Sequence, residues 1–113
     1  MAKYLISFPS SAMTVSEDEF EAAVRDSHAV VREAKAAGVW VFGGGIDESV
    51  PPVMVTGSGS VLETTYEETR RIEGGYCVLD VPTREEALEW ARRIAVGCRC
   101  AQEVRVFQDD PES

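Results

Sequence analysis

Two segments of the sequence carry complete sets of helix signals, and their positions limit the folds that this chain can adopt. Ser16 precedes a segment with acidic residues in its first turn, and Glu19 completes a capping box three residues later. Thr83 begins a second segment with the same kind of capping box. In both segments the apolar residues recur at helical spacing on one face. We therefore predict two amphipathic helices that lie on a sheet and end at Gly38 and Gly97.

Short apolar runs rich in β-branched and aromatic residues surround these helices and are typical of strands. The runs cover residues 4–8, 39–42, 53–55, 76–81 and 104–107. Their order with the helices is strand, helix, strand, short strand, strand, helix, strand. This order is the split βαβ pattern of a ferredoxin-like α+β fold with an antiparallel sheet. We predict one domain over residues 1–108 and a polar tail over residues 109–113.

Two helices cover only one face of a four-stranded sheet, which leaves the other face to be accounted for. The strands carry many apolar side chains, which we predict to be shared between the two faces: Tyr4, Ile6, Val39, Val41, Cys77, Leu79, Val104 and Val106. An apolar sheet face of that size needs a cover. We expect a second copy to provide it, sheet against sheet, in a homodimeric α+β barrel. The run Gly43 to Gly45 is predicted to interrupt its strand with a bulge or a close backbone approach.

The charge and cysteine content exclude several functions. A net charge of −9 would repel nucleic acid and an anionic membrane surface. The sequence has no apolar run long enough to cross a membrane, and its first residues read as a strand and not as a signal peptide. An odd set of three cysteines, Cys77, Cys98 and Cys100, then indicates reduced thiols and a cytoplasmic protein. With His28 as the one histidine, we expect no metal site and no cofactor.

The stretch from residue 61 to 81 is the part of the chain that most suggests a site. A polar segment, residues 63–71, leads through Gly74 and Gly75 into a strand. A polar segment that enters a buried strand commonly presents side chains at the rim of a pocket.

The candidate catalytic residues are His28, Glu68 and Glu63. His28 is the one imidazole, so acid–base chemistry near neutral pH would fall to it. Glu63 or Glu68 would orient it or share in the proton transfer. The alternative for His28 is a half-exposed surface position beside the apolar face of its helix.

The candidate substrate-binding residues are Tyr66, Thr69 and Arg70. The planar guanidinium of Arg70 matches a carboxylate, which suits a small anionic metabolite. Tyr66 offers a hydroxyl and an aromatic face for stacking. The alternative for this cluster is a solvated strand edge, on which Glu68 and Arg70 point the same way.

The sequence resembles the YCII-related family, and more closely its DGPF-type branch. The pieces that carry the resemblance are Lys3-Tyr4-Leu5-Ile6, Gly74-Gly75-Tyr76 through Asp80-Val81, Glu86-Ala87-Leu88-Glu89-Trp90-Ala91 and Glu103-Val104-Arg105. Where that branch has a DGPF-A-E-T-K motif, this sequence has Tyr66 in place of the phenylalanine and Glu68-Thr69-Arg70 in place of E-T-K. The aspartate, glycine and proline of the motif are absent.

The resemblance implies a dimeric α+β barrel with a cleft beside the sheet. The family includes or resembles small-ring enzymes such as muconolactone isomerases and chloromuconolactone dehalogenases. Some members carry an Arg-x-x-His pattern, kept here as Arg25 to His28, whose histidine is proposed to work with an aspartate near the end of the first strand. Here that strand ends as Ser7-Phe8-Pro9-Ser10.

Three functions follow from these observations. The first is a cofactor-free isomerase, lyase or dehalogenase that acts on a small ring or carbonyl compound, with His28 as the proton carrier. The second is a non-catalytic dimer that binds a ligand or a partner protein. The third is a purely structural interaction module.

Overall fold

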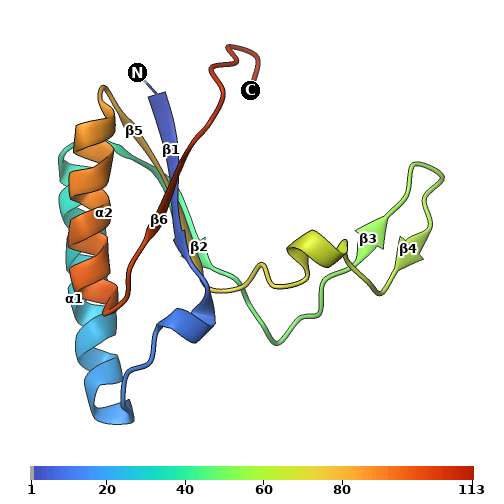
Figure 1. Ribbon diagram of the computed structural model, residues 1–113, viewed down its shortest axis with the longest axis horizontal. Coiled ribbons are helices and arrows are strands. Elements are labelled where there is room, and N and C mark those ends of the chain that lie inside the picture. The colour runs from blue at the N-terminus through green and yellow to red at the C-terminus, as the bar shows by residue number, and fades with distance from the viewer. Residues whose placement is uncertain (1) are drawn as a thin grey trace.

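The computed structural model describes residues 2–113 as a four-stranded antiparallel sheet with two α-helices packed on one face (Figure 1). The elements of this layer pair are β1 (Ala2–Phe8), α1 (Glu17–Ala36), β2 (Trp40–Gly45), β5 (Gly75–Val81), α2 (Arg84–Cys98) and β6 (Glu103–Val106). The strand order is β2-β5-β1-β6, which is the ferredoxin-like order. The predicted α+β class, the two helices and the antiparallel sheet are therefore confirmed.

The helix starts form as the capping residues predict. The Ser16 hydroxyl accepts a hydrogen bond of 3.3 Å from the backbone N–H of Glu19. The Thr83 hydroxyl accepts one of 3.2 Å from Glu86. Both bonds satisfy amide groups that have no partner within the helix. At the other end of α1, Gly38 takes the left-handed conformation, with φ of +75°, that a helix stop favours.

The predicted end of the second helix at Gly97 is wrong. The helix α2 continues to Cys98, and Arg99 takes the left-handed position with φ of 60°. Gly97 is instead buried against α1, where a β-carbon would lie 3.1 Å from the Cα of Ser27. The Arg99 guanidinium donates to the Gly97 carbonyl at 2.8 Å and pairs with Asp26 at 2.9 Å. Glycine is needed there for close helix packing, and side-chain bonds hold the strained arginine in place.

The predicted division of apolar strand residues between the two sheet faces is also wrong. Most of them fill the layer between the sheet and the helices: Tyr4, Ile6, Val39, Cys77, Leu79 and Val104. The reason is the two-residue period of a strand, which places Tyr4 and Ile6 on one face, opposite Leu79 and Cys77 in the pairing register. Val41 and Val106, the remaining two, are exposed.

The open sheet face is consequently mixed in character. Leu5 pairs with Val78 across β1 and β5, and Phe42 pairs with Val78 from β2. Phe42 is 71% exposed. Beside these apolar residues, Lys3 forms an ion pair of 3.7 Å with Asp80.

The glycine run does not interrupt β2. The strand continues through Gly45, and the register shift lies earlier, between Trp40 and Phe42. Gly43 lies under the Trp40 ring, where a β-carbon would come within 2.5 Å of the ring carbons. The expected close approach of another backbone is therefore wrong at Gly43, where the approaching groups are side chains.

Residues 46–74 form an arm that projects from the sheet on the side away from the helices (Figure 1). It contains a two-stranded hairpin, β3 (Met54–Val55) with β4 (Val61–Leu62), and a 3₁₀ turn, η2 (Glu67–Thr69). The radius of gyration is 15.8 Å, whereas a compact chain of about this size has about 13 Å. The arm accounts for this extension.

Candidate functional site

A cavity of about 570 Å³ lies at the end of the sheet where β1 and β2 finish and β5 begins. It also receives residues from both helices and from the short 3₁₀ turn η1 (Ser10–Ala12). Its apolar walls come from Ile6, Phe8, Met13, Val15, Phe20, Val31, Trp40, Ile46 and Ile94. Its polar groups are Ser10, Ser27, Glu48, Tyr76 and Gln102, with the thiols of Cys77 and Cys98. Apolar walls with a few polar groups are typical of a small-molecule site.

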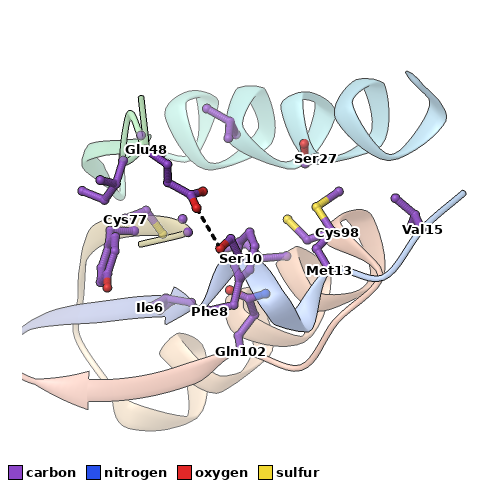
Figure 2. A pocket seen from close by; sticks show the side chains of 18 of the residues that line it. Ile6, Phe8, Ser10, Met13, Val15, Ser27, Glu48, Cys77, Cys98 and Gln102 are labelled. Atoms are coloured by element: carbon purple, nitrogen blue, oxygen red, sulfur yellow. Dashed lines mark hydrogen bonds between the residues drawn. The ribbon is translucent and has the colours of Figure 1, made fainter. Parts of the chain in front are cut away.

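One carboxylate reaches this cavity. Glu48 lies in the first part of the arm, and its side chain points to Ser10, whose hydroxyl donates to Glu48 Oε1 at 3.3 Å (Figure 2). Among the residues that line the cavity, Glu48 is the one that carries a charge at neutral pH. A cation or a hydrogen-bond donor on a ligand would therefore find its acceptor at Glu48.

The two ends of the arm meet beside the cavity. The backbone N–H of Ile46 donates to the Gly74 carbonyl at 2.9 Å. Gly74 has φ of +103°, and a β-carbon there would lie 2.1 Å from the Phe8 carbonyl oxygen. Glycine is required at this position because β1 passes directly against it. The paired glycines of the sequence thus close the arm and shape the cavity wall.

Tyr76 borders the cavity from β5, and its side chain lies on the open sheet face, opposite to that of the adjacent Cys77. Burial, and secondarily the nearby charge of Glu73, raise the pKa of Tyr76. The phenol therefore stays protonated at neutral pH.

The two cavity thiols are poor nucleophiles. Burial, with a smaller effect of Cys98, raises the pKa of Cys77 to about 12. Burial also raises the pKa of Cys98 to about 11. A thiol must lose its proton to attack, so both side chains act as apolar wall. All three cysteines are free.

The predicted catalytic histidine lies outside this cavity. His28 is an exposed residue of α1. It lines a second hollow of about 410 Å³ on the outer surface of that helix, with Phe20, Glu21, Val24, Arg25 and Arg32. Its neighbour Ser27 faces the cavity instead, because successive helical residues are rotated by about 100°.

The other predicted site residues, catalytic and substrate-binding, lie on the arm, and all of them are exposed: Glu63, Tyr66, Glu68, Thr69 and Arg70. The segment is partly a 3₁₀ turn and not the strand edge of the alternative interpretation. Arg70 pairs with Glu67 at 3.4 Å. None of these five residues lines the cavity or the hollow that contains His28. Within one chain the structure does not bring the candidate site residues together.

Sequence reasoning did not identify Ser10, Glu48, Tyr76 and Gln102 as residues of a site. Tyr76 had a signal, since the paired glycines before it were expected at the rim of a pocket. Glu48 had a weaker one, as an acidic residue in a loop just after the glycine-rich strand. Ser10 and Gln102 lie far apart in the chain and meet at the cavity only through the fold.

No group of three or more histidine, cysteine or acidic side chains within residues 2–113 is arranged to hold a metal ion. Neither α1 nor α2 combines the length and the apolar character that crossing a membrane requires.

The sheet order and the two helices define a small α+β protein of ferredoxin-like topology. The chain belongs to the YCII-related domain family, whose model matches residues 3–108. A solved structure similar to this chain is 5-chloro-2-hydroxyhydroquinone dehydrochlorinase from Burkholderia phenoliruptrix AC1100, in complex with 2,5-dihydroxybenzoquinone. The two share 14% identity over 97% of each chain, with a TM-score of 0.49. No curated protein matches the sequence.

Proposed function

We propose that this protein binds a small ring compound in the cavity and catalyses its isomerisation or elimination without a cofactor. The observation that carries the proposal is a carboxylate, Glu48, at an otherwise uncharged and largely apolar cavity of about 570 Å³. This volume lies within the range of roughly 300–1,000 Å³ that small-molecule sites occupy. The resemblance to small-ring isomerases and dehalogenases in the sequence agrees with this class of reaction.

The lining favours a ligand without negative charge on its buried part. No lysine, arginine or histidine lines the cavity, so a buried anion would lack a counter-charge. A carbonyl or hydroxyl group has donors and acceptors available at Ser10 and Gln102. The anionic metabolite expected from Arg70 would need that arginine to be brought to the site by another copy of the chain.

The chemistry that we assign to the site is proton transfer at carbon. Glu48 removes a proton from a carbon next to a carbonyl group, and the electron pair moves onto the carbonyl oxygen. The side-chain amide of Gln102, which lines the cavity, stabilises that oxygen by a hydrogen bond. The proton then returns to another carbon, which is isomerisation, or a leaving group departs with its bonding electrons, which is elimination.

We also propose that the protein is a homodimer through the open sheet face. Exposed apolar residues on this face, above all Phe42, support the proposal.

A non-catalytic ligand-binding dimer is the second candidate. The placement of His28 outside the cavity favours it, because the one imidazole then takes no direct part in chemistry there.

Turnover of muconolactone and of its methyl ester separates these candidates. The ester lacks the carboxylate, so we expect it to bind more tightly than the free acid. Glu48→Gln should lower turnover by about 100-fold or more, with little change in binding. Asp47→Asn is the matched control, because Asp47 is adjacent in sequence and does not line the cavity. His28→Ala tests the proton carrier expected from the sequence.

Three results would change the proposal. Unchanged turnover in Glu48→Gln would remove Glu48 from the mechanism. A loss in His28→Ala alone would return the chemistry to the histidine. Binding without turnover over long incubation would favour the non-catalytic dimer.

A further inference from the structure

We infer that the arm of one copy packs along α1 of a second copy, in the hollow that contains His28, and brings acidic residues to that histidine. The inference rests on the homodimer proposed above and not on the ligand or the reaction.

The arm has the surface of an interface and no cover in its own chain. Its exposed large apolar residues are Ile46, Val50, Val53, Val55, Val61, Leu62, Tyr66 and Ile72. A hairpin of two strands is marginally stable by itself in water and needs a third element to pack on. Exposed apolar surface of this extent marks a contact site.

The arm is also acidic, and its far part most clearly. It contains the carboxylates Asp47, Glu48, Glu63, Glu67, Glu68 and Glu73 and the two cations Arg70 and Arg71. Arg70 is already paired with Glu67. Glu63 and Glu68 form no ion pair within residues 2–113 and flank the exposed ring of Tyr66.

The hollow on α1 complements the arm in charge and in apolar character, with two arginines and His28 against the one carboxylate of Glu21. Arg25, His28 and Arg32 are spaced by three and four residues, so they form one row along the helix. Phe20 and Val24 give the hollow an apolar wall, and Phe20 is 53% exposed. Neither arginine forms an ion pair within residues 2–113.

The arm cannot fill the hollow of its own chain. The helices cover one face of the sheet, and the arm projects from the other side (Figure 1). A second copy on the open sheet face would lie beside the arm, which would then extend toward that copy's helices. Because a two-fold axis repeats every contact, each arm would occupy the other copy's hollow, and both surfaces would be covered at once.

This contact would assemble the residues that one chain keeps apart. His28 has no acidic partner within residues 2–113. The docked arm would supply the partner's Glu63, Tyr66 and Glu68 beside it. A carboxylate next to an imidazole fixes its tautomer and orientation. The hollow would become a composite site that adjoins the cavity lined by Glu48 and shares Phe20 with it.

Charge reversal across the two surfaces tests this contact. The first variant is Glu63→Arg with Glu68→Arg, and the second is Arg25→Glu with Arg32→Glu. Each variant alone places like charges together in both contacts of a dimer. An equal mixture of the two variants can form a heterodimer. In this heterodimer the arginine-bearing arm meets the glutamate-bearing helix, and the wild-type arm meets the wild-type helix, so both contacts are complementary.

We expect sedimentation equilibrium at low salt to show weaker dimers for each variant alone, by about tenfold or more in Kd. The mixture should recover the wild-type Kd to within about threefold. Glu85→Arg with Glu112→Arg is the matched control for the first variant, with the same change in net charge away from both surfaces, and should leave the Kd unchanged.

Val78→Glu on the open sheet face separates this inference from the dimer itself. A dimer that Val78→Glu disrupts but that neither charge-reversal variant weakens would overturn the arm contact and leave the dimer standing. A monomeric wild-type protein would overturn both. If each variant alone weakened the dimer and the mixture did not recover the wild-type Kd, the result would also contradict the inference. It would show that the substitutions act by some effect other than charge pairing between the arm and the hollow. Ligand binding in the cavity is measured independently of all these outcomes.

Discussion

Gly97 of α2 packs against Ser27 of α1 so closely that a β-carbon at Gly97 would lie 3.1 Å from the Ser27 Cα and 3.2 Å from the Asp26 carbonyl oxygen. This contact sets the distance between the two helices beside the cavity, because the side chain of Ser27 lines it from α1 and Cys98 lines it from α2. Helix spacing and cavity shape therefore depend on one residue without a side chain.

Replacing Gly97 by alanine should destabilise the protein. Alanine in a helix gains about 1 kcal/mol of propensity over glycine, but overpacking against backbone atoms costs about 1–3 kcal/mol. We expect a net loss of about 1 kcal/mol in the free energy of unfolding, measured by urea denaturation. Gly57→Ala is the control, because no atom lies within 4 Å of its added β-carbon. A stabilised Gly97→Ala protein would show that the helices can separate at little cost.

Replacing Gly74 by alanine should have a larger effect. The substitution adds a β-carbon in a left-handed conformation and directly against the Phe8 carbonyl. Backbone strain of this kind costs about 1–3 kcal/mol before the clash is counted. We expect a loss of at least about 2 kcal/mol in urea denaturation. Gly44→Ala, on the neighbouring strand with no atom within 4 Å, should be nearly neutral.

The cavity thiols should react slowly in the folded protein. With pKa values of about 12 for Cys77 and about 11 for Cys98, few of these thiols are ionised at pH 8. An unfolded cysteine has a pKa near 8.5. We expect a thiol-specific chromogenic disulfide to react with Cys98 at least about a hundredfold more slowly in the folded than in the urea-unfolded protein. Equal rates would contradict the burial of this thiol.

The same raised pKa values predict a loss of stability at alkaline pH. The folded state keeps these thiols protonated, so their contribution is complete below the unfolded pKa of about 8.5. It is lost as the pH rises from there toward the folded values of about 11 and 12. We expect the free energy of unfolding of Cys98→Ala to fall less steeply than that of the wild type between pH 8 and pH 11. Parallel curves would exclude Cys98 as a cause.

Local signals in the sequence predicted the helices and strands well. Ser16, Thr83 and Gly38 act through nearby backbone groups, so their effect can be read from neighbouring residues alone. The role of Gly97 could not be predicted in this way, because glycine is required there by a contact with Ser27 on another helix. The same glycine pattern stands at the end of one helix and inside the other.

The candidate site was harder to predict for a similar reason. Ser10 and Glu48 form their hydrogen bond across 38 positions of sequence, and no local pattern indicates such a meeting. The polar residues of the arm were easily recognised in the sequence. The sequence pattern does not predict the direction in which the arm projects from the sheet. In the structure the arm carries Glu63, Tyr66 and Glu68 away from the cavity, and we propose a role for them in a second copy.

The most direct test of the proposed ligand site uses the fluorescence of Trp40, which lines the cavity. Trp90→Phe removes the other tryptophan, which packs outside it beneath Arg93. Titration with muconolactone methyl ester should then give a saturable change in emission, with a Kd in the millimolar range or tighter. Val31→Phe, added to fill the cavity, should abolish the change. A signal that does not saturate, or that persists in the filled variant, would contradict the proposal that this cavity is the ligand site.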